Sequence, residues 1–417
     1  MTAASTLSST RRGPLIGLLA GHTVSLTGNM LTLVALPLYV LAETGSATAT
    51  GIAGFFATLP VVIGGPLGGV LADRFGYRRS SVTADLVSAG TIGAVPVLDR
   101  TVGLPLWLLF ALVFLSGLLD TPGQTARSAL VPDVASAAGI PLERAVGWLE
   151  ATERAARLIG ALLAGLLVTA LGALPVLAID AGTFVISSAL VAFLVPRQFD
   201  LDADPWREGN SDEPRGYWRQ LAEGFRFAAR EPLLRAVVLL VVVTNLFDAA
   251  KTTVILPVYA QRELTGALAL GLLVAAMGAG ALVGSIAFGA VGHRLPRRRT
   301  FVIAFALAGA PPFFAMAAGL PITALLVVAA LSGFAAGAIN PIISTIELER
   351  VPAGMRARVF GLIGAGCWAA MPLGALIAGI AVERLGMTTT LVTVGAAYLL
   401  VTLTPLLGGP WRQLDRA

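Results

Sequence analysis

The sequence predicts an all-α polytopic membrane protein in which twelve transmembrane helices form two pseudo-symmetric six-helix bundles. Hydrophobic residues make up 56% of the 417 residues and charged residues only 13%, about half the charged fraction of an ordinary globular protein. The apolar residues fall into runs of about 20, the length that spans a bilayer core. The two halves of the chain also repeat one another in register, as in transporters built from parallel repeats.

Twelve runs satisfy the length that a bilayer requires. Prolines and glycines interrupt many of them, which membrane helices tolerate when neighbouring helices satisfy the freed backbone groups. The predicted spans are 14–41, 47–72, 81–98, 104–127, 144–170, 173–195, 235–260, 267–291, 300–319, 321–346, 357–382 and 387–408.

The arginines fix the predicted orientation. With both termini in the cytoplasm, the inner loops are rich in arginine and the outer loops poor, as the positive-inside rule requires. The net charge of +5 therefore reflects topology, and we expect no nucleic-acid partner. The inner arginines are Arg74, Arg78, Arg79, Arg144, Arg294, Arg297, Arg298, Arg299, Arg356 and Arg358, and the outer ones are Arg100, Arg262 and Arg384.

A long polar segment divides the twelve spans into six and six. We predict an N-terminal bundle at 1–195, a cytoplasmic linker at 196–234 and a C-terminal bundle at 235–417. Within the linker, Trp218 and Phe225 lie on one stripe of an amphipathic helix. That helix either lies on the anionic inner leaflet or is a solvated linker helix that packs on the bundle.

Several short motifs recur with a constant shift of 220 residues. A later pair shows a shift of 214, so the second half has lost six residues after its fourth helix. The pairs are "LPLY" at 36–39 with "LPVY" at 256–259, "GVLADRFGYRR" at 69–79 with "GAVGHRLPRRR" at 289–299, "VP" at 131–132 with 351–352, and "GALLAG" at 160–165 with "GALIAG" at 374–379.

The stretch "GGVLADRFGYRR", between spans two and three, resembles the loop 2–3 signature of the major facilitator superfamily. The resemblance implies a cytoplasmic gate motif, which Asp85 joins one turn later. Glycine at position 76 suits a tight turn, and the arginines suit the inner membrane surface. The motif residues are Gly69, Asp73, Arg74, Gly76, Arg78 and Arg79.

Longer stretches narrow the resemblance to a subgroup of that superfamily. "TPGQTARSALVPDV" and "RARVFGLIGAGCWAAMPLGALIAG" are similar to the twelve-span exporters of the macrolide, tetracycline–aminoglycoside and enterobactin type. The resemblance implies proton-driven export. One departure is that Gly160 is followed by Ala161, where such antiporters usually carry glycine-proline.

The composition excludes several kinds of chemistry. One cysteine and two histidines leave no material for a disulfide or a histidine–cysteine metal site. A phosphate-binding loop needs a lysine after its last glycine, and the only lysine, Lys251, follows Ala250. We therefore expect no enzyme activity, metal or cofactor. The energy for any transport would come from an ion gradient, from the gradient of the substrate or from a partner.

Ionisable and amide side chains inside the spans are the candidate transport residues, because each is unfavourable in lipid. In the arrangement that the family resemblance implies, helices 1, 4, 7 and 10 line a central cavity. Asn29, Asp120, Asp248 and Asn340 lie well inside these helices, and Asp120 and Asn340 are related by the 220-residue shift. A purely structural hydrogen-bonding role for the two asparagines remains an alternative.

Asp248 and Lys251 are three residues apart, so they share a helix face and can form an ion pair. Unlike arginine, a desolvated lysine can lose its proton. The pair can therefore couple protons or bind substrate. The alternative is a neutral pair that only fixes the helix.

Helix five begins with two i,i+4 charge pairs, Glu150–Arg154 and Glu153–Arg157. Four charges at this depth indicate either a water-filled inner cavity or a gate network that breaks as the two halves move. The alternative is that part of this ladder lies at the membrane interface.

These observations predict a proton-coupled exporter of drugs or natural products that works by alternating access in the cell membrane. The partners would be protons, the lipid bilayer and an amphipathic small molecule, and we expect a monomer. The nearly balanced charges give at most a slight preference for cationic or zwitterionic compounds. A proton-coupled importer of a small metabolite and a non-transporting membrane receptor or scaffold are the alternatives.

Overall fold

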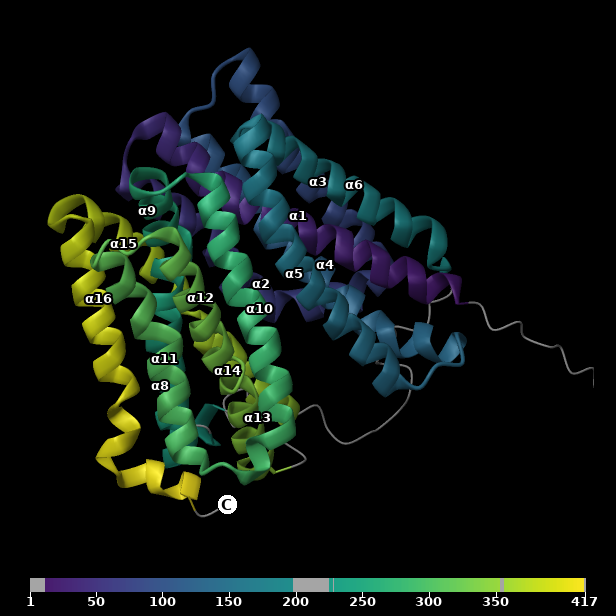
Figure 1. Ribbon diagram of the computed structural model, residues 1–417. Coiled ribbons are helices and arrows are strands. Elements are labelled where there is room, and N and C mark those ends of the chain that lie inside the picture. The colour runs from purple at the N-terminus through teal and green to yellow at the C-terminus, as the bar shows by residue number, and fades with distance from the viewer. Residues whose placement is uncertain (1–11, 198–224, 228, 353–355, 416–417) are drawn as a thin grey trace, which may run out of the picture. The chain divides into compact units, whose positions relative to one another are not determined.

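The computed structural model describes residues 12–197, 225–227, 229–352 and 356–415 (Figure 1). The side chains of residues 65–74, 356–358, 361 and 415 lie outside the description, although their backbone is included. Most of the linker predicted at 196–234 therefore falls outside the described residues. The same applies to the side chains of Gly69, Asp73 and Arg74.

The described residues form helices and no strands. Short 3₁₀ turns follow α10 and α16. The N-terminal helices are α1 (Gly13–Thr44), α2 (Ala47–Phe75), α3 (Tyr77–Thr101), α4 (Leu106–Ala137), α5 (Leu142–Leu171) and α6 (Ala173–Leu194). The later helices are α8 (Pro232–Ala250), α9 (Leu256–Glu263), α10 (Ala267–Val291), α11 (Arg297–Ala317), α12 (Ile322–Ala336), α13 (Ile339–Arg350), α14 (Arg356–Trp368), α15 (Met371–Leu385) and α16 (Met387–Thr402).

The all-helical membrane fold is confirmed. Twelve segments of the described chain are long and apolar enough to cross a membrane, and each coincides with one predicted span. The longest, such as Gly13–Thr44, have 32 residues, about 48 Å at 1.5 Å per residue. Such helices exceed the roughly 30 Å hydrocarbon core and extend into the polar interface.

The chain divides into two compact units. Unit 1 comprises Met1–Leu31, Ile63–Gly160 and Leu177–Gly209, and unit 2 comprises Thr32–Val62, Ala161–Val176 and Asn210–Ala417. The boundaries pass through α1, α2, α5 and α6, so the units differ from the six-plus-six division, which remains a prediction.

Small residues allow close helix packing within each unit. In unit 1, a Cβ atom at Gly123 of α4 would lie 2.9 Å from the Ala84 side chain of α3. In unit 2, Gly284 of α10 and Gly333 of α12 lie directly against the backbone of the opposite helix. Such small-residue contacts bring helix backbones together where burial of apolar surface gives no driving force.

Three of the membrane helices in unit 2 depart from α-helical geometry. Lys251–Ile255 forms a π-helical turn between α8 and α9. Breaks at Gly337–Ala338 and Ala369–Ala370 separate α12 from α13 and α14 from α15. π-Helical turns inside α-helices often mark functional sites, and interrupted membrane helices often surround transport sites.

Candidate functional site

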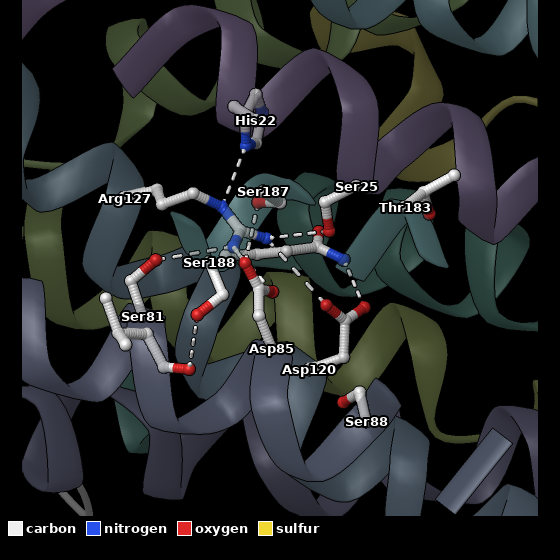
Figure 2. A network of polar contacts seen from close by, with 12 residues as sticks. His22, Ser25, Ser81, Asp85, Ser88, Asp120, Arg127, Thr183, Ser187 and Ser188 are labelled. Carbon is white, nitrogen blue, oxygen red and sulfur yellow. Dashed lines mark hydrogen bonds and ion pairs between the residues drawn. The ribbon is translucent and has the colours of Figure 1, made fainter. Parts of the chain in front are cut away.

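A buried arginine lies at the centre of a polar network in unit 1 (Figure 2). Arg127, on α4, is 0% exposed. Its Nη1 donates to both carboxylate oxygens of Asp85, at 2.8 and 2.9 Å, and its Nη2 donates to the Ser25 hydroxyl at 3.2 Å. A buried charge needs an ion pair and hydrogen bonds in place of its lost water. Arg127 therefore joins α1, α3 and α4.

Asp85 is the carboxylate most tightly held by this arginine. It lies on α3, is 0% exposed, and also accepts a 2.6 Å hydrogen bond from the Ser187 hydroxyl of α6. The sequence associates Asp85 with Asp73 and Arg74, whose side chains are outside the description. Its described partners place it in the Arg127 network, and its association with Asp73 and Arg74 remains a prediction.

Asp120 has one oxygen fully engaged and one available. Its Oδ2 accepts hydrogen bonds from Asn29 Nδ2 at 2.8 Å and from Gln124 Nε2 at 2.7 Å. Its buried Oδ1 has no hydrogen-bond partner in the described structure and lies 3.8 Å from Arg127 Nη2. An unsatisfied buried oxygen is rare in proteins, and this one can hold a proton.

His22 connects the arginine to a more exposed acid. Arg127 Nε donates to His22 Nδ1 at 3.4 Å, and His22 Nε2 lies 3.0 Å from Glu153 Oε1. Because Nδ1 accepts, we assign the ring proton to Nε2, which donates to Glu153. The Glu153 side chain is 26% exposed, so His22 bridges a buried cation and a partly accessible carboxylate.

Both predicted charge pairs of α5 are present. Glu150 and Arg154 approach within 3.7 Å, and Glu153 and Arg157 within 3.9 Å. The side chains of Glu150, Arg154 and Arg157 are each about half exposed or more, and isolated exposed pairs contribute little to stability. Glu153 differs because it also reaches the buried network.

The buried part of this network contains more acidic than basic side chains. Asp85 and Asp120 carry two negative charges when both are ionised, whereas Arg127 supplies one positive charge and His22 is neutral in the assigned tautomer. An uncompensated charge is unfavourable in a low-dielectric interior. One bound proton makes these four side chains electrically neutral.

The predicted pair of Asp248 and Lys251 forms in unit 2. Lys251 is 3% exposed, and its Nζ donates to Asp248 Oδ1 at 2.8 Å. The hydroxyl of Tyr398, on α16, donates to Asp248 Oδ2 at 3.2 Å. Lys251 Nζ also lies 5.8 Å from the centre of the Phe313 ring, within cation–π range.

Two cavities with shared wall residues lie in this part of unit 2. The Asp248 cavity, of about 160 Å³, is lined by Asp248, Thr244, Tyr398 and Asn340, among others. The Glu347 cavity, of about 400 Å³, is lined by Glu347, Asn340, Cys367 and Trp368, among others. Both include Asn245 and Asn340 in their walls, so the two cavities are neighbours.

The structure therefore groups the predicted residues into two sets, one in each unit. Asn29 and Asp120 are hydrogen-bonded in unit 1, and Asp248, Lys251 and Asn340 lie around one region of unit 2.

Among the described residues, no three His, Cys, Asp or Glu side chains are placed to hold a metal ion.

The gate-motif residues with described geometry lie in unit 1. Gly76 has φ 87°, the left-handed conformation that favours glycine at the turn between α2 and α3. Arg78 donates to the carbonyls of Ala192 and Val195 at the end of α6, at 2.6 and 2.7 Å. The gate role of the motif remains a prediction.

Sequence reasoning missed Arg127, Tyr398 and Glu347. Arg127 follows Asp120 by seven residues, almost two helical turns, so both lie on one face of α4. Glu347 follows Asn340 by the same spacing and lies 220 residues after Arg127. Applying the repeat to every charged residue would have found Glu347, whereas no local pattern marks Tyr398.

Among the described residues, twelve segments that can cross a membrane and several buried charged side chains are typical of a polytopic membrane transporter. The chain belongs to the Major Facilitator Superfamily, whose family model matches residues 18–266 and 238–415. It is a multi-pass protein of the cell membrane.

Several characterised relatives are similar over almost the whole chain. The multidrug efflux pump Tap of Mycolicibacterium fortuitum is 30% identical, covering 99% of both chains. The Tap pump of Mycobacterium tuberculosis (strain ATCC 25618 / H37Rv) is 28% identical, covering 99% of this chain and 97% of the relative. Macrolide efflux protein A of Streptococcus pyogenes is 23% identical, covering 95% and 96%.

Solved structures share the fold at low sequence identity. The nucleoside transporter NupG has a TM-score of 0.75 at 12% identity, covering 97% of this chain and 99% of its own. A bacterial homologue of the iron transporter ferroportin, in the inward-facing state, has a TM-score of 0.71 at 17% identity, covering 97% and 99%. These similarities show the fold alone.

Proposed function

We propose that the protein exports amphipathic drugs or natural products from the cytoplasm, driven by proton entry and working by alternating access. The names of the Tap and macrolide efflux relatives support drugs as the transported compounds and export as the direction. The observation that carries proton coupling is the free oxygen of Asp120, 3.8 Å from the buried Arg127.

The proposed coupling step is protonation of Asp120. The ionised carboxylate attracts Arg127 across 3.8 Å while Asp85 holds the same guanidinium at 2.8 Å. A proton on Asp120 removes one of these attractions and makes the cluster neutral, which changes the free-energy difference between transporter conformations. Glu153 and His22 form the path between the partly exposed surface and this cluster.

The Asp248–Lys251 pair is the second candidate for coupling. Its ammonium group is buried while the Asp248 side chain is 36% exposed toward a cavity. We assign substrate contact to this region of unit 2, and proton binding to the unit 1 network.

Everted membrane vesicles provide the test. An imposed pH gradient, acidic inside, should drive a macrolide or a fluorescent dye into vesicles that contain the wild-type protein. Asp120→Asn should abolish this uptake, whereas Glu143→Gln, an exposed acid on α5, should leave it unchanged. Normal uptake by a folded Asp120→Asn variant would contradict the coupling step. Accumulation only in right-side-out vesicles would instead identify an importer.

A further inference from the structure

Glu347 is a cavity-lining carboxylate for which the described side chains supply no counter-charge. It lies on α13 and forms part of the wall of the Glu347 cavity. No hydrogen bond or ion pair of the described structure reaches its side-chain oxygens, although Val351 N–H bonds to its backbone carbonyl at 3.0 Å. A negative charge facing a cavity without a partner attracts a cation.

The neighbouring charges on the same helix are paired. Arg297 Nη1 donates to both oxygens of Glu349, at 2.8 and 2.9 Å, and Arg350 lies 3.5 Å from Glu231. In the adjoining cavity, Asp248 is paired with Lys251. Among the acids that line the two cavities, Glu347 is therefore the one whose charge remains available to a ligand.

The internal repeat relates this acid to the Arg127 network of the first half. Glu347 lies 220 residues after Arg127, and the position equivalent to Asp85, the ion-pair partner of Arg127, is Phe305. The position equivalent to Ser25, which accepts a hydrogen bond from Arg127, is Asn245. At the position of Arg127, the second half thus carries a negative side chain. At the position of its partner Asp85, the second half carries an uncharged one. A closed ion-pair network in unit 1 corresponds to an open cavity in unit 2.

The rest of the cavity wall suits an aromatic ligand. Phe360, Trp368, Met371 and Ile363 supply apolar and aromatic surface, and Trp368 is 44% exposed. Asn245 donates to the Cys367 carbonyl at 2.9 Å, next to the break between α14 and α15. A volume of about 400 Å³ falls in the range of drug-sized sites. Aromatic faces also attract cations.

We propose that Glu347 is the recognition group of a cation-binding site that takes aromatic, positively charged amphipathic compounds. The site rests on the proposed export function, because it specifies the substrate class of that transporter. The ligand cation lies near the carboxylate, and its rings pack against Trp368 and Phe360. The asparagine amides of Asn245 and Asn340 supply neutral hydrogen-bonding groups at the junction with the Asp248 cavity.

Equilibrium binding to the purified full-length protein in detergent tests this assignment without requiring transport. The ligand is tetraphenylphosphonium, a permanent aromatic cation, and triphenylphosphine oxide is its uncharged comparison. Glu347→Gln should weaken tetraphenylphosphonium binding about tenfold or more, as expected when about 1.4 kcal/mol of charge interaction is lost. Binding of the uncharged compound should change less than twofold. Glu349→Gln is the matched control on the same helix and should behave as wild type.

Because no described contact depends on the Glu347 carboxylate, Glu347→Gln and Glu347→Ala should both fold, and either variant serves if the other is not recovered. Equal tetraphenylphosphonium affinity in wild type and variant overturns the proposal, as does an equal loss for both compounds. A wild-type protein that does not bind the cation also overturns it. Cation binding that depends on Glu347, in a protein without proton-driven uptake, would uphold this site and refute the export proposal.

Discussion

Arg127 and Asp85 form a fully buried ion pair that joins α4 to α3. Both side chains are 0% exposed, and a single guanidinium nitrogen contacts both carboxylate oxygens at 2.8 and 2.9 Å. Asp85 is further held by Ser187, so α6 is tied to the same pair. The pair therefore combines a structural role with a position next to the proposed proton site.

Removing the arginine charge should destabilise the protein. Arg127→Gln leaves Asp85 without its cation at a site with no access to water, and breaking a buried pair in this way costs about 3–5 kcal/mol. The midpoint of thermal unfolding in detergent should fall clearly relative to wild type. Arg154→Gln, which removes an arginine that is 48% exposed, should shift it little. Equal midpoints for the two variants would show that Arg127 contributes no more than a surface charge.

The sequence was sufficient to predict the twelve spans because the bilayer imposes a length on every apolar run. It was also sufficient for pairs within one helix, such as Asp248–Lys251 and Glu150–Arg154, because helical spacing alone brings them together. Pairs between helices, such as Arg127–Asp85 and Tyr398–Asp248, depend on how helices rotate and pack. No local spacing in the sequence determines that rotation.

Arg127 also shows how a hydropathy boundary can mislead. The predicted fourth span ends at residue 127, so this arginine looks like an interfacial residue. The structure continues α4 to Ala137 and buries Arg127 completely. The same happens 220 positions later, where the predicted tenth span ends at residue 346 but the structure continues α13 to Arg350 and places Glu347 in the wall of a cavity.

His22 should act in proton transfer more than in folding. We predict that His22→Phe, which removes both ring nitrogens, slows uptake driven by a pH gradient at least tenfold in everted vesicles. Substrate exchange across the membrane without a pH gradient needs no net proton movement, so it should continue. If gradient-driven uptake and exchange fell equally, the histidine would be a structural link between Arg127 and Glu153.

Lys251 and Asp248 should depend on one another. Lys251→Met leaves Asp248 with only the Tyr398 hydroxyl as a described partner, and Asp248→Asn leaves a buried ammonium group without its carboxylate. Each single variant should therefore lower the unfolding midpoint, and the double variant should recover part of the loss. A double-mutant cycle measures this coupling.

Transport by the double variant then separates the two roles left open by the sequence. A stable double variant that no longer exports would show that the charges act in coupling or substrate binding. A stable double variant with normal export would reduce the pair to a neutral element that fixes α8.

Glu383, near the end of α15, should hold the start of α2 in place. Its Oε2 accepts hydrogen bonds from the Ser46 hydroxyl at 2.7 Å and the Thr48 backbone N–H at 2.8 Å. The first N–H groups of a helix lack partners within the helix, and a carboxylate also interacts favourably with the helix dipole. Gly51 and Gly379 allow close backbone contact between α2 and α15. Under the alternating access that we propose, this contact opens during the cycle.

We therefore expect Glu383→Ala to favour the open form at this end of α2. Ala47 is 1% exposed and its carbonyl lies against Gly379 of α15, so a cysteine placed there reports opening through its rate of reaction with a water-soluble thiol reagent. Cys367, the chain's only cysteine, is replaced by serine in the same background. The Ala47→Cys thiol should react several-fold faster when Glu383 is alanine, and a substitution of exposed Arg384 on the same helix end should have no such effect. An unchanged labelling rate would mean that Glu383 caps α2 without controlling its separation from α15, because the cap would then be lost while the helix contact persists.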